Sequence, residues 1–282
     1  MSDRRADRWN GLRRDRAATG HRDAYLDTGQ ERPQVRPLCP VGDDAVKGDE
    51  HISISLATAA TVLAPLLLTI PPEWAVAALF GVFIGALAPD ADANDSAIFH
   101  THMPGRRGRR VYFLPFFGYG IKYLVYYPIS LPFILFLGER GMPRHRGVLH
   151  SGIGVLLMTL VVGFYAWLLG TAVLGFPWNG AVQAFLFGLF GGAVFHLLED
   201  SCTKSGVAWL FPLSAHRTKG RIVTGNDDRR PAAYVLVMGA GAVGVFAACV
   251  MGQIPVELIP WSGAALAAAL WGIFLIISRF GR

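Results

Sequence analysis

The sequence predicts an all-α membrane protein: a polytopic transmembrane helical bundle of about six spans plus one re-entrant or interfacial segment. Hydrophobic residues make up 52% of the 282 residues, and only 16% are charged, whereas a soluble domain usually carries about a quarter charged residues. The mean hydropathy is +0.39. Uncharged runs recur along the chain, most of them long enough to cross a hydrocarbon core about 30 Å thick. A single soluble core does not account for six such runs in series.

The first 50 residues differ from the rest. They hold ten Lys/Arg and ten Asp/Glu, interleaved, with few apolar residues, a composition that buries too little surface to fold alone. We predict a disordered polar N-terminal tail over 1–50. Because this tail is close to charge-neutral, no specific nucleic-acid binding is expected. The first apolar run begins after Glu50 and follows no signal-peptide pattern, so the first span is expected to act as its own insertion signal.

Six apolar stretches follow as predicted spans. The long uncharged run 147–198 is divided in two at the Gly-Phe-Pro-Trp-Asn sequence of 175–179, because glycine and proline interrupt helices. The spans are 52–70, 73–89, 150–174, 178–198, 232–251 and 257–278.

A seventh apolar segment, 111–138, is of a different kind. It contains Lys122, Pro128, Pro132 and a row of Tyr and Phe residues, which are typical of a membrane interface rather than its centre. At 28 residues it is too short for two full spans. A re-entrant or interfacial course would bring it back to the face from which it starts.

The distribution of Lys and Arg predicts the orientation. If 111–138 returns to the same face, every Lys and Arg outside that segment lies on one side, and the opposite loops hold only Glu73 and Glu257 as charged residues. Positive charge collects on the cytoplasmic side. We therefore predict a multi-pass protein of the inner (plasma) membrane with both termini cytoplasmic. If 111–138 crosses once instead, the basic loops divide between the two faces and the bias weakens.

Histidines and aspartates gather at the ends of the first four spans. An odd span begins where an even span ends, so these residues are expected at one membrane depth. Imidazole and carboxylate groups suit Zn²⁺, Mn²⁺ or Fe²⁺, and His196 and Asp200, four residues apart, share a helix face. One such residue alone is usually an interfacial polar group, but the set predicts a metal site. Its candidate ligands are His51, Asp90, Asp92, His145, His150, His196 and Asp200.

The same residues carry a family resemblance. The run Gly85–Asp92, then His145–Ser151, then His196–Gly206 resembles, in that order, the YdjM-like family of inner-membrane metal-dependent hydrolases, often described as LexA-regulated. The family is distantly similar to zinc phospholipase C. The resemblance covers about residues 51–230. Family members often have a histidine directly after the second aspartate, where this chain has Ala93.

The resemblance implies a metal-dependent hydrolase, and we expect it to be a phosphoesterase. It divides the chain into the tail, a membrane-embedded hydrolase core over 51–230 and a C-terminal transmembrane helix pair over 231–282. Zn²⁺ is favoured over Mn²⁺ and Fe²⁺. Asp90 or Asp92 is the candidate base or bridging ligand, and Arg146 is a candidate to steady a phosphate. A site at the membrane–cytosol boundary suits a lipid or polyprenyl phosphate, so membrane lipids are the expected partners; the sequence predicts no oligomeric state.

Two other functions fit the same residues. A non-catalytic membrane scaffold would use a structural metal site with a closed set of ligands. A metal or ion transporter would use the His/Asp set as a pathway and would need polar residues deep within the spans, where this sequence is almost entirely apolar. An intramembrane metalloprotease of the H-E-x-x-H type is not indicated, since that motif does not occur in the chain.

Overall fold

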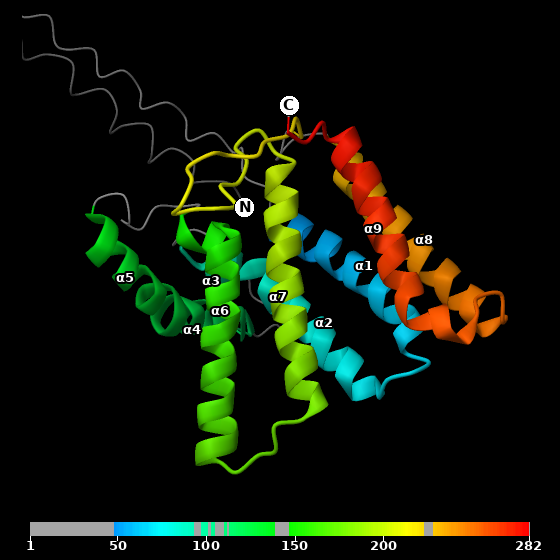
Figure 1. The fold of residues 1–282 in the computed structure, drawn as a ribbon, viewed down its shortest axis with the longest axis horizontal. Helices are drawn as coiled ribbons and strands as arrows, with labels where there is room; N and C mark the ends of the chain where they lie inside the picture. The colour runs from blue at the N-terminus through cyan, green and yellow to red at the C-terminus, as the bar shows by residue number, and fades with distance from the viewer. Residues whose placement is uncertain are drawn as a thin grey trace, which may run out of the picture. The chain divides into compact units, whose positions relative to one another are not determined.

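The computed structural model describes residues 48–92, 97–100, 103–104, 110–111, 113–138, 147–222 and 228–281. The predicted tail up to residue 47 lies outside these ranges. The described chain is built of helices (Figure 1), apart from two antiparallel two-residue strands, β1 (Met103–Pro104) and β2 (Arg110–Val111). The predicted all-α class is confirmed.

The first two helices are α1 (Gly48–Leu66) and α2 (Pro72–Leu87). Pro72 stands in the first turn of α2, where its missing N–H costs nothing. Pro89 follows the other end of α2, and the chain tightens there into a 3-10 turn, η1 (Pro89–Asp92). Because proline cannot donate to the helix ladder, the two aspartates leave the helix axis at this point.

The aromatic segment forms one helical stretch that is not uniform. It consists of α4 (Phe113–Gly120), a π-helical part η3 (Ile121–Tyr126) and α5 (Tyr127–Leu137), preceded by the short α3 (Ala97–His100). Figure 1 shows α4 and α5 inclined to α6. The re-entrant or interfacial course of segment 111–138 stays a prediction.

The next two helices form an antiparallel pair. A 3-10 turn, η5 (Val148–His150), leads into α6 (Gly152–Tyr165), which continues as η6 (Ala166–Val173) before α7 (Gly180–Ser201). Ser151 caps α6 by accepting from the Gly154 N–H, and Asn179 caps α7 by accepting from the Val182 N–H. These caps satisfy amide groups that a helix start leaves open, and they fix where each helix begins.

The last two helices are α8 (Arg230–Val250) and, after the turn η7 (Val256–Leu258), α9 (Ile259–Ile277). Four helices in the described ranges are long and apolar enough to cross a membrane: Gly152–Val173, Gly180–Ser201, Arg230–Val250 and Val256–Ile277. The apolar helices Glu50–Leu66 and Pro72–Leu87 are shorter, and α2 extends only about 24 Å. Transmembrane helices are confirmed, whereas the count of six spans stays a prediction.

Backbones meet most closely between α2 and α7. A Cβ atom added to Gly85 would overlap the Leu189 carbonyl oxygen, and one added to Gly188 would overlap the Ala78 carbonyl oxygen. Gly81 and Gly192 are in similar contact with the facing helix. Small residues allow such an approach where lipid gives helices no hydrophobic reason to associate. This contact places the end of α2 beside α7, and the turn η1 with Asp90 and Asp92, which follows α2, lies near the end of α7.

Helix α1 lies beside α7 on one side and the α8–α9 pair on the other (Figure 1). Its buried hydroxyls join it to that pair: Thr61 Oγ1 donates to the Met238 carbonyl oxygen at 2.9 Å, and Trp271 Nε1 donates to Thr58 Oγ1 at 3.2 Å. A cluster that includes Ile54, Met238 and Trp271 fills the space between them. These contacts fix the position of α1, whose start, with His51, lies against the end of α7.

Candidate metal centre

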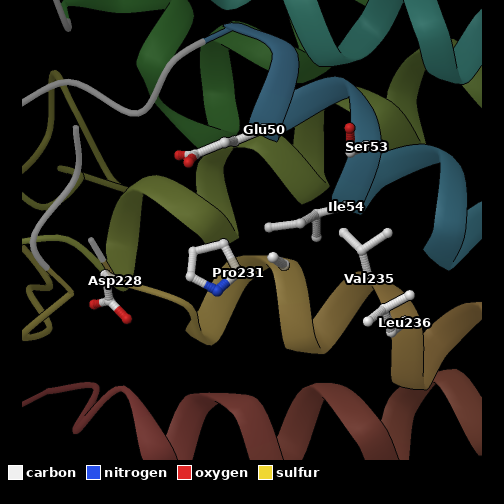
Figure 2. Close-up of a pocket in the computed structure, with 8 residues that line it drawn as sticks. Glu50, Ser53, Ile54, Asp228, Pro231, Val235 and Leu236 are labelled. Atoms are coloured by element: carbon white, nitrogen blue, oxygen red, sulfur yellow. The ribbon is translucent and has the colours of Figure 1, made fainter. Parts of the chain in front are cut away.

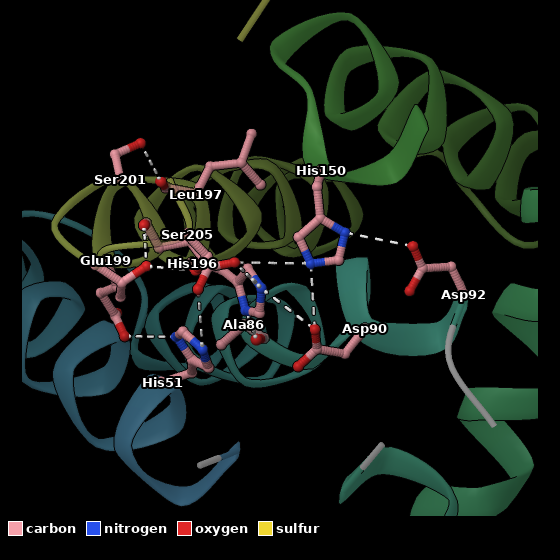
Figure 3. Close-up of polar contacts among 12 residues, drawn as sticks. His51, Ala86, Asp90, Asp92, His150, His196, Leu197, Glu199, Ser201 and Ser205 are labelled. Carbon is pink, nitrogen blue, oxygen red and sulfur yellow. Dashed lines mark hydrogen bonds and ion pairs between the residues drawn. The ribbon is translucent and has the colours of Figure 1, made fainter. Parts of the chain in front are cut away.

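Five predicted ligands from four separate elements meet at one end of the helices (Figure 3). His51 comes from the first turns of α1, Asp90 from η1, His150 from η5, and His196 and Asp200 from the last turns of α7. The three imidazoles and Asp200 are buried, each with at most 2% of its side chain exposed, while the Asp90 side chain is 18% exposed. The site is therefore closed on most sides and open at Asp90.

Two overlapping groups have the spacing of metal ligands. One consists of His51, His196 and Asp200, and the other of Asp90, His150 and His196; within each, the candidate ligand atoms lie within 4.8 Å of one another. The groups share His196, whose one inward ring nitrogen can bind one ion. This sharing favours a single ion.

The second group, with Asp200 added, fits a tetrahedral ion. Asp90 Oδ1 lies 3.2 Å from His150 Nε2 and 3.6 Å from His196 Nε2. Asp200 Oδ2 lies 3.8 Å from each of the same two nitrogens. Ligands about 2.0–2.1 Å from a tetrahedral zinc lie roughly 3.3–3.4 Å apart, so a slight contraction of these four atoms would make a zinc cage.

His196 is held in one orientation by backbone. Its Nδ1 lies 2.7 Å from the carbonyl oxygen of Ala86, one of the last carbonyls of α2, which have no partner within their own helix. A carbonyl oxygen can only accept, so Nδ1 carries the proton and donates the hydrogen bond to Ala86. The other ring nitrogen, Nε2, then has a lone pair available to bind a cation. Nε2 is buried and has no hydrogen-bond partner among the described residues. A buried lone pair facing two carboxylates is what a cation site requires.

His51 is held by a carboxylate that the sequence reading missed. Glu199 Oε2 lies 2.7 Å from His51 Nδ1, and Ser55 donates a hydrogen bond to Glu199 Oε1 at 3.1 Å. This leaves His51 Nε2 facing Asp200 Oδ1 at 3.9 Å. A histidine that gives its outer N–H to a carboxylate is the common support of metal-binding imidazoles. The sequence held one indication of a shared polar partner: Ser55 follows His51 by four residues, so both side chains lie on one face of α1.

Asp92 lies on the outer side of His150. Its Oδ2 is 3.5 Å from Nδ1 of that ring, whereas Asp90 and Asp200 face Nε2. Asp92 thus belongs to neither group of candidate ligands, and its place is that of a residue that orients His150. The proline turn separates the two aspartates in this way, since it sends their side chains in different directions.

Three predicted features lie outside the described residues. His145, proposed as a ligand, and Arg146, proposed as a phosphate contact, both fall in the undescribed range 139–146, and Ala93 falls in 93–96.

The carboxylates change the acidity of the site. Burial by itself would lower the pKa of His150, but hydrogen bonds to Asp90 and Asp92 outweigh burial and raise the pKa to about 10. Burial would raise the pKa of Asp90, but His196, and then His150 and His51, hold that pKa far below its usual range. The site therefore favours a cation at neutral pH, whether a proton on His150 or a metal ion.

This competition predicts a pH dependence. In the metal-free protein, protonated His150 stabilises the fold below its ordinary pKa of 6.5, and that contribution is lost as the pH rises to about 10. Zn²⁺ binding to His150 at pH 8 is expected to release about one proton per chain. The affinity of the site for Zn²⁺ is expected to rise as the pH increases from 6.5 to about 10. Calorimetry in two buffers of different ionisation enthalpy measures this release; a count near zero contradicts the ligand role of His150.

A separate pocket of about 380 Å³ opens between the starts of α1 and α8 (Figure 2). Glu50 and Asp228 flank it, and Ile54, Pro231 and Val235 line its apolar part. Asp228 is already in a salt bridge with Arg230. None of the candidate ligands lines this pocket, so it is distinct from the metal groups.

Comparison with known protein families agrees with the ordered motifs. The family model described as YdjM inner membrane protein matches residues 46–279. The chain belongs to this family. The match takes in all five residues of the site and both C-terminal helices, which extends the YdjM relationship beyond the predicted range 51–230. No curated protein and no solved structure matched the chain.

Proposed function

We propose that this YdjM protein is a membrane-bound metal-dependent hydrolase that cleaves a phosphoester, of a lipid or polyprenyl phosphate, at the cytoplasmic membrane face. The observation that carries the proposal is His196 Nε2. This buried nitrogen has no hydrogen-bond partner among the described residues, and it faces the carboxylates of Asp90 and Asp200 beside His150. Three of these ligands are almost fully buried, and only Asp90 is partly open. A structural metal would need no such opening.

The residues divide the work. Asp90, His150, His196 and Asp200 would hold one divalent ion, with Zn²⁺ favoured over Mn²⁺ and Fe²⁺. When bound, such an ion would supply a Lewis acid for a phosphoryl oxygen and would lower the pKa of a water molecule toward neutrality. Asp90, at the open side, is the candidate to accept a hydrogen bond from the attacking water through the carboxylate oxygen that does not bind the ion, and to take its proton once the ion has lowered the pKa of that water. Asp92 and Glu199 orient His150 and His51, and Arg146 remains the candidate contact for phosphate.

The position of the site supports a lipid substrate. All five site residues lie at or beyond the ends of apolar helices, at the depth where α2 and α7 end and α6 begins. A lipid phosphate reaches this depth by lateral diffusion, with its tail remaining in the membrane. Both termini and the basic loops would then be cytoplasmic, as the charge distribution indicates.

The transporter alternative expects ionisable groups deep in the spans. In α1 and α7 as described, the charged residues lie near the site end; the deeper polar groups of α1 are hydroxyls, and α7 adds the Gln183 amide near its opposite end. Thr58 and Thr61 donate to carbonyl oxygens of Ile54 and Ala57 in their own helix, an arrangement typical of helix packing. These contacts favour an enzyme or a scaffold over an ion pathway.

The test is hydrolysis by the full chain reconstituted in liposomes and loaded with Zn²⁺ or Mn²⁺. Substrates would be a phosphatidic acid, a polyprenyl diphosphate and a soluble aryl phosphate, with lipid products identified by mass spectrometry and ¹⁸O-water used to show which bond takes up water. We expect turnover of a lipid substrate that Asp90→Asn lowers by at least about 100-fold and that Asp228→Asn preserves. If metal-loaded protein cleaves none of the three, the hydrolase proposal is wrong and the scaffold with a structural metal is favoured.

A further inference from the structure

The loop between α7 and α8 has an unusual composition. Its first part, residues 202–222, contains four Lys/Arg residues and no Asp or Glu, and the two carboxylates of the loop, Asp227 and Asp228, come just before α8. All four cations are exposed: Lys204, Arg217, Lys219 and Arg221. Between them the chain exposes two leucines, Leu210 with 61% and Leu213 with 82% of the side chain accessible. Two leucines this exposed within four positions, on a loop outside the candidate spans, are a candidate contact with an apolar environment.

The rest of the loop is well fixed. Thr203 forms a bridge with Ile222, and Val207 with Thr218, which closes the loop at its base. The Trp209 carbonyl oxygen accepts from the Gly152 N–H at the start of α6, and the Arg221 N–H donates to the Ser278 carbonyl oxygen just after α9. Both contacts are with residues at the ends of candidate spans, so the loop is held beside the ends of α6, α7 and α9 (Figure 1).

The loop is also joined to the metal centre. Thr203 Oγ1 donates to the Asp200 carbonyl oxygen at 2.7 Å, and Trp209 Nε1 donates to Ser201 Oγ at 2.9 Å. These two hydrogen bonds join the loop that carries the leucines to the last turn of α7, which carries Asp200.

We propose that loop 202–222 is a lipid-binding element: Leu210 and Leu213 insert into the headgroup region of the adjoining leaflet, and the four cations bind anionic phospholipid headgroups beside the metal centre. Charge complementarity selects anionic lipid, since residues 202–222 carry four cations and no carboxylate, and Asp228, later in the loop, is paired with Arg230. Apolar side chains flanked by basic ones are the usual composition of interfacial membrane-binding elements. This inference goes beyond hydrolysis and holds whether or not the protein is an enzyme.

The experiment uses the full chain in liposomes, with a fluorescent probe on Leu213→Cys. Cys39→Ser removes a native thiol, and the parent without Leu213→Cys measures background from the buried Cys202 and Cys249. Quenching by lipids brominated near the headgroup is compared with quenching by aqueous iodide, in vesicles of phosphatidylcholine alone and with added phosphatidylglycerol. Leu213 is exposed, so its replacement is not expected to affect folding.

We expect lipid quenching to exceed iodide quenching, and the ratio to rise at least about twofold with phosphatidylglycerol. The rise should disappear in Lys204→Gln/Lys219→Gln and persist in the control Arg13→Gln/Arg14→Gln, which removes the same number of cations from the N-terminal part of the chain, outside the loop. Dominant iodide quenching would overturn insertion, and a ratio unaffected by phosphatidylglycerol would overturn anionic-lipid binding. Neither result depends on metal content or turnover, so failure here is distinguishable from failure of the proposed hydrolase.

Discussion

Asp200→Asn is expected to remove bound metal from the purified protein. Asp200 faces every imidazole of the site: Oδ1 lies 3.9 Å from His51 Nε2, and Oδ2 lies 3.8 Å from His150 Nε2 and from His196 Nε2. Asparagine keeps the shape but lacks the charge that offsets a divalent ion. Metal content by mass spectrometry, after reconstitution with Zn²⁺ or Mn²⁺, should fall from about one ion per chain to background.

Two comparisons sharpen this prediction. Glu199→Gln changes a residue that orients His51, and His51 in turn faces Asp200 Oδ1. Loss of this outer support of a ligand should weaken metal affinity by about 10–100-fold without abolishing it. Asp228→Asn removes a carboxylate that is paired with Arg230 away from the site, and it should retain full metal content. Circular dichroism would establish that each variant is folded. If folded Asp200→Asn keeps the metal content of the wild type, the centre described here is not the metal site.

Gly188→Leu is expected to destabilise the protein more than any surface substitution. The added side chain has no space, because a Cβ at this position would already overlap the backbone of Ala78 in α2. Overpacking of a filled interior costs about 1–3 kcal/mol or more, and here a rigid helix backbone must move. The expected result is a clearly lower melting temperature in detergent, followed by differential scanning fluorimetry.

Gly244→Leu is the matched control. It also introduces leucine at a glycine of an apolar helix, but apart from the adjoining backbone of α8 no atom of the described residues lies within 4 Å of a Cβ placed there, so its melting temperature should be unchanged or higher. Gly188→Leu should also lower metal content, since α2 supplies the Ala86 carbonyl that orients His196. Equal melting temperatures for Gly188→Leu and the wild type would mean that α2 and α7 do not pack this closely.

The carboxylates of the site show where sequence reasoning reached its limit. Asp90 and Asp92 looked equivalent in the sequence, as two acids after a proline, but Asp90 faces His150 Nε2 and Asp92 faces Nδ1 of the same ring. Glu199 was read only as part of a motif, although it holds His51. Spacing along one helix predicts a shared face, but it does not predict which neighbour from another helix a side chain meets.

The sequence by itself determined the class of the protein and its family, and it predicted most of the residues that the site brings together. Those features follow from local composition: apolar length sets what can cross a bilayer, and alternating spans place odd starts beside even ends. Only the tertiary structure decided which of these residues share a centre. The glycine contact of α2 with α7, and the hydroxyl contacts of α1 with α8 and α9, bring His51, Asp90, His150, His196 and Asp200 together. Those contacts join residues up to 213 positions apart in the chain, and long-range packing of this kind is not encoded in any local pattern.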